Sequence, residues 1–213
     1  SGLSVHFKDL ELYRNTMDSS GYWPLVRCPV MFISSSNDFH AAFDRIYKSM
    51  DLLPHKNWRI STNVHANHGP VAEQWIMLNQ WFDYYLKGTG AAVPETPRSS
   101  FDVKDNLANF TVTPTAQEKL VNTEIYYSYD PNARTRFWKR AKASKSGGGW
   151  SAKIAVHDEL PLYVYALCRY NLSGKRSVQN GDTATFTLNS LEHVYMPSDF
   201  NAATLNKLTQ HSV

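Results

Sequence analysis

Residues 28–38 have the sequence CPVMFISSSND, in which a short apolar run breaks into polar residues. The run at residues 28–33 shows no apolar–polar alternation, which is typical of a strand buried on both faces of a parallel sheet. The polar residues that follow, ending at Asp38, predict a loop at the carboxyl end of this strand. A second strand is predicted at residues 57–61, and it leads into a loop at residues 63–70 that contains His68.

Each predicted strand is followed by residues with helical periodicity. Apolar residues after the first strand recur at steps of three and four and end at Pro54. They are Phe39, Phe43, Ile46, Met50 and Leu53. After the second strand the same spacing continues as far as Lys87 and Gly88, a cation and a glycine that end a helix. Those positions are Val71, Trp75, Leu78, Phe82 and Tyr85. The order strand, helix, strand, helix predicts an α/β fold with a parallel sheet over residues 1–88.

The composition changes after this unit. Residues 89–100 are rich in Gly, Pro and small polar residues, which predicts a linker. Residues 101–213 then contain short alternating runs separated by turn residues, and these predict an antiparallel β-sandwich as a second, accessory domain. The predicted strands are residues 109–113, 124–129, 160–170, 183–188 and 192–196.

Length and composition indicate a globular protein. The chain has 213 residues, 42% of them hydrophobic and 13% aromatic, and a formal net charge of +3. These values exclude a disordered chain, a collagen and a coiled coil. No apolar stretch approaches the roughly 18 residues that a membrane-spanning helix needs, so no membrane partner is expected. The N-terminus lacks the pattern of a signal peptide and begins without Met, which fits a processed product or a fragment.

The cysteine content leaves the cellular compartment open. Cys28 and Cys168 are the two cysteines of the chain. Two cysteines exclude a disulfide framework but allow a single bridge. Secretion and a periplasmic location therefore stay among the alternatives.

Asp38 and His68 are the predicted catalytic residues. Each stands in a loop directly after a predicted strand, and parallel sheets place active sites at the carboxyl ends of their strands. In a Ser-His-Asp device the carboxylate orients the imidazole, and the imidazole accepts the proton of the nucleophile. Two simpler interpretations stay open: Asp38 caps the helix that follows it, and His68 is a loop histidine bonded to backbone.

Several short motifs, in this order, resemble the C-terminal part of an α/β-hydrolase catalytic domain. They are residues 29–34 followed by Asn37 and Asp38, then Trp58-Arg59, His68-Gly69-Pro70 and residues 81–88. The resemblance is to the group of acetyl xylan esterases, dienelactone hydrolases and prolyl oligopeptidases. It implies that Asp38 is the acid and His68 the histidine of a catalytic triad that uses no metal or organic cofactor. Residues 123–150 also resemble the β-sandwich tail of hydrolases related to the PhoPQ-activated pathogenicity-related proteins.

The chain lacks the Gly-x-Ser-x-Gly elbow that carries the nucleophile in that family. In residues 2–6 a glycine precedes Ser4 by two positions, but His6 replaces the second small residue. The resemblance therefore implies part of a serine hydrolase whose serine lies in a missing N-terminal portion or on a second chain. The expected substrate is a small-molecule or glycan ester, and this chain alone is expected to be inactive. A peptidase of the prolyl oligopeptidase type is the alternative within enzymes.

Two further histidines are candidates for the rim of the predicted site. His40 follows Asp38 by two residues, and His65 precedes His68 by three. His65 and His68 also have the spacing of a metal pair. Two ligands in a loop without a nearby carboxylate or cysteine make a weak site, so no metal is expected.

A basic segment in the second domain gives a hypothesis of a different class. Residues 134–145 contain six Lys and Arg residues, with Phe137 and Trp138 among them. Such a mixture suits an acidic glycan or nucleic acid, and Arg136, Trp138 and Arg140 are the predicted contacts. The small net charge and the lack of a nucleic-acid-binding motif argue against nucleic acid. A polysaccharide-binding module is therefore the alternative to an enzyme, unless the cations only line a solvated edge strand, the simpler interpretation.

Overall fold

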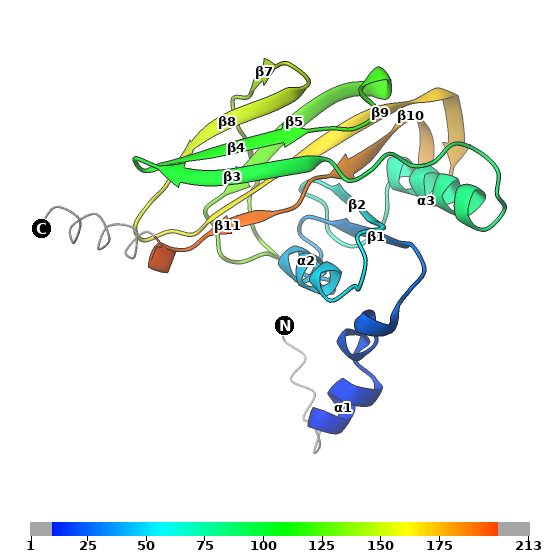
Figure 1. The fold of residues 1–213 in the computed structure, drawn as a ribbon, viewed down its shortest axis with the longest axis horizontal. Coiled ribbons are helices and arrows are strands. Elements are labelled where there is room, and N and C mark those ends of the chain that lie inside the picture. Colours follow the sequence, from blue (N-terminus) through cyan, green and yellow to red (C-terminus); the bar gives the residue numbers. More distant parts are fainter. Residues whose placement is uncertain (1–9, 200–213) are drawn as a thin grey trace, which may run out of the picture.

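The structure is a computed structural model that describes residues 10–199. Residues 2–6, where the sequence comes nearest to a nucleophile elbow, lie outside the described residues. Figure 1 shows most strands gathered in one part of the molecule, with a smaller group of helices and short strands beside it. No helix within residues 10–199 has the length and apolar character needed to cross a membrane.

A strand–helix–strand–helix unit follows three short helices. The short helices are α1 (Leu10–Thr16), η1 (Ser19–Gly21) and η2 (Trp23–Leu25), and the unit is made of β1 (Val30–Ser35), α2 (Phe43–Asp51), β2 (Trp58–Asn63) and α3 (Ala72–Tyr85). β1 and β2 pair in parallel, in agreement with the predicted order. α2 begins later than the periodicity predicts, because the side chain of Asp38 accepts hydrogen bonds from the backbone of His40 and Ala41 and holds them in a turn.

Two antiparallel sheets make up the rest of the described chain. The first has the order β3 (Arg98–Lys104), β4 (Leu107–Thr113), β8 (Gly149–Ala155) and β7 (Ser144–Ser146). The second has the order β10 (Gly181–Asn189), β9 (Leu162–Val178), β5 (Leu120–Ser128) and β6 (Lys139–Arg140), and β11 (His193–Tyr195) also pairs with β9. The short 3-10 helix η3 (Gln117–Lys119) precedes β5. These sheets form a β-sandwich-like fold.

β3 occupies residues that the sequence assigns partly to a linker. Its side chains alternate between exposed and half-buried, and it lies at the edge of its sheet. An edge strand with one solvated face carries few apolar residues, so its composition is close to that of a loop. Composition alone therefore does not separate residues 98–100 from the preceding loop.

The helical unit and the sandwich share their hydrophobic cores. In one cluster, Met77 and Trp81 of α3 pack with residues of both antiparallel sheets, Phe110 and Val164 among them. In a second cluster, aromatic and aliphatic residues of α2 and β2 pack with the sandwich. The members of that cluster include Phe43, Ile46, Met50, Ile60, Trp138 and Tyr165. Both cysteines are free: Cys168 is buried in the first cluster, and Cys28 is exposed.

The predicted α/β-hydrolase sheet is wrong. Among residues 10–199 parallel pairing occurs only between β1 and β2, and the other strands are antiparallel. The outer edge of β2 meets β10 through side chains and adds no further parallel strand. Ser61 Oγ lies 2.9 Å from Thr187 Oγ1, and the Thr62 N–H donates to Asn189 Oδ1 at 3.1 Å. These polar contacts end the parallel sheet at two strands and dock it on the sandwich.

Candidate functional site

The loops that follow β1 and β2 bring Asp38 and His68 together. His68 Nδ1 lies 2.9 Å from Asp38 Oδ2. The other carboxylate oxygen, Oδ1, accepts the backbone N–H groups of His40 at 2.8 Å and Ala41 at 3.0 Å. One carboxylate thus orders the turn before α2 and holds the imidazole. The capping role and the contact with His68, which the sequence presents as alternatives, occur in the same side chain.

The hydrogen bonds to Asp38 favour its ionised form. Asp38 is 4% exposed, and its burial alone would raise its pKa. Hydrogen bonds from the Ala41 N–H, from His68 and from the His40 N–H outweigh burial and hold the pKa of Asp38 below its usual value. A carboxylate that stays charged at neutral pH is the form that orients a histidine and stabilises its protonated state.

The His68 ring reaches solvent while one nitrogen is held. Its side chain is 59% exposed, against 5% for that of Asp38. Because Nδ1 faces a carboxylate, the favoured tautomer carries its hydrogen on Nδ1 and leaves Nε2 as a proton acceptor. The rings of Phe39 and His40 flank His68, with centroids 5.8 Å and 5.1 Å from it. His40 therefore lies beside the pair.

His65 belongs to the supporting structure of this region. Its backbone N–H donates to Ser36 Oγ at 2.8 Å, and its Nε2 accepts the backbone N–H of Trp138 at 3.0 Å. Its ring stacks on Phe137, with centroids 4.6 Å apart and an interplanar angle of 15°. In this arrangement Nε2 of His65 is used in a structural hydrogen bond to the sandwich. Across the described residues there is no group of three or more His, Cys, Asp or Glu that could hold a metal ion.

The basic segment is divided between the core and the edge. Arg136 and Trp138 are each 1% exposed, so neither is available on the surface for the predicted ligand contact. Arg140 is exposed in β6, the edge strand of its sheet, and its side chain donates to Glu124 at 2.8 Å. Alternation in an extended chain explains only why Phe137, between these two buried residues, is exposed. Arg140 has the same alternation as Arg136 and Trp138, and its exposure follows from its place at the sheet edge. A continuous basic strip is therefore absent from residues 136–140.

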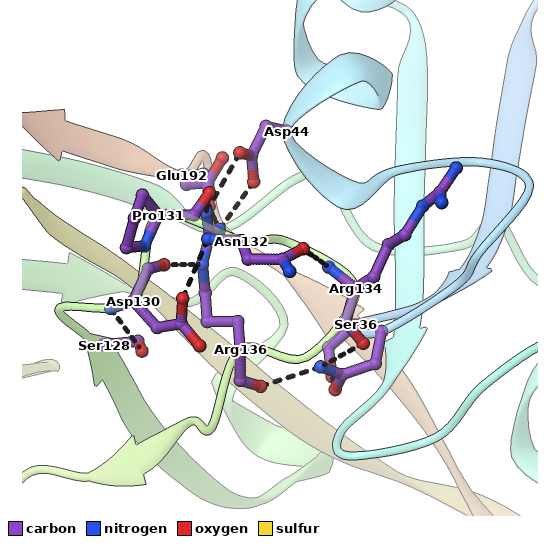
Figure 2. Close-up of polar contacts among 10 residues, drawn as sticks. Ser36, Asp44, Ser128, Asp130, Pro131, Asn132, Arg134, Arg136 and Glu192 are labelled. Atoms are coloured by element: carbon purple, nitrogen blue, oxygen red, sulfur yellow. Dashed lines mark hydrogen bonds and ion pairs between the residues drawn. The ribbon is translucent and has the colours of Figure 1, made fainter. Parts of the chain in front are cut away.

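Arg136 is the centre of a buried ionic cluster, which Figure 2 shows. Its two terminal nitrogens donate to the two carboxylate oxygens of Asp44 at 2.6 Å and 3.1 Å, and one of them lies 3.4 Å from Glu192. Its Nε donates to the carbonyl oxygen of Asp130 at 2.7 Å, and the guanidinium lies 3.5 Å from the centroid of the Tyr163 ring. The cluster joins α2 to the loop before β6 and to the residue before β11.

The two acidic side chains of this cluster share one cation. Burial raises the pKa of Glu192 to about 8, the nearby charge of Asp44 adds to the rise, and Arg136 opposes it. Asp44 takes the bidentate contact, so the second carboxyl is the one that stays protonated at neutral pH. No sequence signal marks this cluster, because Asp44 and Glu192 are distant in sequence and lie in unremarkable polar segments.

The cluster also fixes the loop that carries Asp38. Asn37, the residue before Asp38, donates from its side chain to the carbonyl oxygens of Arg134 at 3.3 Å and Arg136 at 2.7 Å. Arg136 is thus tied to α2 through its side chain and to the loop after β1 through its backbone carbonyl. The position of Asp38 relative to the sandwich follows from these contacts.

Comparisons with known proteins identify no family for this chain. No family model matches the chain, and no curated protein matches it significantly. Among solved structures, one match is a crystal structure of the β-1,3-glucan binding domain of carbohydrate-binding module family 56, with 10% sequence identity and a TM-score of 0.29. That match covers 47% of this chain and 98% of the other. A likeness at this level supports no statement about function.

The resemblance to the α/β-hydrolases is wrong as a statement of family, because parallel pairing among residues 10–199 is limited to β1 and β2. The short motifs that carry it lie in these two strands, in the loops after them and at the end of α3, and similar residues arise wherever a strand leads into a polar loop and a helix. Membership in the acetyl xylan esterase group and in the PhoPQ-related hydrolases is wrong for the same reason. The contact between Asp38 and His68 is independent of that assignment, because it is a distance between two side chains.

Proposed function

We propose that Asp38 and His68 form an acid–base pair that activates a nucleophile for acyl-ester hydrolysis. The observation that supports this is the 2.9 Å contact between Asp38 Oδ2 and His68 Nδ1, made by a buried carboxylate and an exposed ring. The proposal includes no metal and no organic cofactor.

In this mechanism each side chain has one task. His68 Nε2 accepts the proton of a hydroxyl nucleophile as that oxygen attacks the ester carbonyl. Asp38 keeps the ring oriented and stabilises its protonated form. The imidazolium then gives the proton to the leaving alcohol, and a water molecule activated in the same way releases the acid.

The nucleophile is proposed to come from outside the described residues. Serines close to the pair are committed elsewhere: Ser36 Oγ donates to Asn37 Oδ1 at 2.8 Å, and Ser35 is fully buried with its Oγ 3.5 Å from the carbonyl oxygen of Gly69. A serine on a second polypeptide or in a further segment would complete the device. The exposed face of His68 is where it would approach.

The test is fluorophosphonate labelling of natively purified material, combined with intact mass measurement and a rate assay on acetyl esters and peptide amides. We expect a labelled nucleophile, and we expect Asp38→Asn and His68→Ala each to lower ester hydrolysis by at least about a hundredfold. A faster reaction on amides than on esters would replace the esterase with a peptidase.

A matched control uses a histidine outside the pair. His157 is exposed and lies in the loop between β8 and β9, where its ring contacts Tyr129. We expect His157→Ala to keep the full rate of hydrolysis and labelling. Unlabelled protein that is stable as a single folded species, or full activity in both Asp38→Asn and His68→Ala, would show that the pair has no catalytic role.

Polysaccharide binding is a second candidate, favoured by the stack of Phe137 on His65. Phe137 is 64% exposed, so one face of its ring rests on His65 and the other is open to solvent. His65 is fixed by two hydrogen bonds, which makes the pair a rigid aromatic surface. Sugar rings stack their C–H groups on such faces. Because His65 and Phe137 are already held in place, they lose little side-chain entropy when a sugar binds.

Affinity electrophoresis in gels containing a soluble β-1,3-glucan, a xylan or a polyuronate tests this candidate. We expect retardation by one of these polymers that Phe137→Ala abolishes. Tyr84→Ala, which removes an exposed ring from α3, is the control and should leave retardation unchanged. Equal mobility of the native protein in all gels would eliminate polysaccharide binding.

A further inference from the structure

A cavity lies at the N-terminal end of β2, opposite the end that leads to His68. Its lining is cationic and includes Arg59, a buried cation that forms no ion pair with the described residues. Its volume is about 630 Å³, which is the size of a small-molecule site. Lys56, Arg59 and Arg98 line it, against a single acidic residue, Glu95. Trp58 and Asn63 are at opposite ends of β2, so the cavity lies about 17 Å along the strand from the loop that leads to His68.

Arg59 is the main observation. It is 8% exposed, and its contacts are with carbonyl oxygens: Nε donates to Pro94 at 2.5 Å and one terminal nitrogen donates to Trp58 at 2.8 Å. The ion pairs formed among residues 10–199 do not include Arg59. A guanidinium carries five N–H donors, so donors remain for a ligand. Burial without a paired anion is unfavourable for a cation, and a bound anion would remove that cost.

Trp58, which also lines this cavity, carries a second buried donor. Its side chain is 6% exposed, and its indole N–H is buried without a hydrogen-bond partner among the described residues. A buried N–H without an acceptor costs free energy, which an acceptor atom of a ligand would restore. The Trp58 indole N–H and the guanidinium donors of Arg59 that its two carbonyl contacts leave over could therefore both donate to an oxyanion.

The rest of the lining adds apolar surface to the cations. Pro97 is buried and Leu191 is partly exposed at the cavity, and the ring of Trp58 is apolar. Lys56 and Arg98 are exposed at the same cavity, where they attract negative charge from solution. A ligand that suits this lining carries an oxyanion at one end and an apolar body at the other.

We infer that this cavity binds a small organic anion, with its carboxylate, sulfonate or phosphate group against Arg59 and its apolar body against Trp58 and Leu191. The oxyanion accepts from the guanidinium and is attracted by Lys56 and Arg98. The site is separate from the Asp38–His68 pair and does not depend on it.

The test uses the complete 213-residue chain and follows the indole N–H resonances by NMR, with Trp58→Phe identifying the Trp58 signal. Naphthalene-2-carboxylate and naphthalene-2-sulfonate are the anionic probes, and naphthalene-2-carboxamide is the uncharged match. We expect both anions to shift the Trp58 resonance saturably and the amide to bind at least about tenfold more weakly. Inorganic sulfate alone should bind more weakly than either naphthalene anion.

Three variants complete the experiment. Arg98→Gln changes an exposed side chain and should weaken binding of both anions about threefold, while Lys139→Gln, an exposed cation in β6, should have no effect. His68→Ala should also leave binding unchanged, which separates this site from the proposed catalytic pair. Equal binding of the amide, no shift of the Trp58 resonance, equal binding of sulfate alone, or unchanged affinity in Arg98→Gln would each overturn the inference.

Discussion

Two carboxylates in this protein show how environment decides the protonation of one chemical group. Asp38 accepts three hydrogen bonds and stays ionised, so its pKa lies below the usual value despite its burial. Glu192 is buried beside Asp44 with only a share of one guanidinium, and its pKa rises to about 8. The first residue suits the orientation of a histidine, and the second makes folding depend on pH.

Glu192 is expected to make the protein less stable as the pH rises from about 4.5 to about 8. Its pKa is raised on folding from 4.5, so within this range the unfolded carboxyl ionises while the folded one keeps its proton. The stabilising contribution is complete below the lower value and is lost above the upper one. The free energy of unfolding of Glu192→Gln should therefore fall less steeply with pH in this range, by up to about 1.4 kcal/mol per pH unit.

Urea unfolding at pH 5.5, 6.5 and 7.5 measures this effect, with Glu118→Gln as the control because Glu118 is exposed. The free energy of unfolding of Glu192→Gln, relative to that of the native protein, should increase with pH. Glu118→Gln should show no such trend. The same pH profile for native protein and Glu192→Gln would contradict the role given to Glu192.

At the scale of secondary-structure elements, β2 is held by side chains of β10 along the edge where a further parallel strand would pair. Asn189 is fully buried, and its side chain accepts the Thr62 N–H at 3.1 Å and donates to Thr62 Oγ1 at 2.6 Å. Asn189→Ala leaves that buried N–H without a partner and should lower the free energy of unfolding by about 1–3 kcal/mol. Denaturant unfolding checks this value against Asn171→Ala, which changes an exposed residue of β9.

The elements themselves are largely predictable from sequence, while their assembly is not. The periodicity of residues 28–85 predicts β1, α2, β2 and α3 in the correct order, because burial of one helix face and of whole strands leaves a local pattern. The docking of β2 on β10 leaves no such pattern, since Thr62 and Asn189 are 127 residues apart. The sequence therefore predicts the parallel pair of β1 and β2, but it does not predict that the parallel sheet contains no further strand.

The same distinction applies to the candidate sites. Asp38 and His68 can be selected from sequence because each follows a strand directly, and parallel strands bring such loops together. Arg136 is misplaced by sequence reasoning, because arginine is normally exposed and only its contacts with Asp44 and Glu192 explain its burial. Arg59 also stands within a strand, where no sequence feature distinguishes an exposed from a buried cation.

At the scale of the whole molecule, α3 packs into the same core as both antiparallel sheets. Met77 is fully buried in that cluster, so Met77→Ala should lower the free energy of unfolding by about 2–5 kcal/mol. Because the core is shared, the helical unit and the sandwich should unfold in one transition. Leu86→Ala, at a residue that is 76% exposed, should change stability by less than about 0.5 kcal/mol.

Near-ultraviolet and far-ultraviolet circular dichroism, recorded on the same thermal scan, check whether the two parts unfold together. Coincident midpoints in the native protein and in Met77→Ala are expected for a shared core. Two separated midpoints would contradict a single transition and therefore a fully shared core.

The long sequence separation of the docking contacts sets the order in which the molecule assembles. The Tyr47 hydroxyl donates to the carbonyl oxygen of Ser190, 143 residues away, and Arg136 reaches Asp44 over 92 residues. Contacts between such distant residues close large loops and form slowly. During synthesis on the ribosome, α2 and β2 emerge long before β10. Their apolar faces stay exposed to solvent until β10 has been synthesised. A chaperone that covers those faces until the last strands appear would therefore raise the yield of native protein without raising its free energy of unfolding.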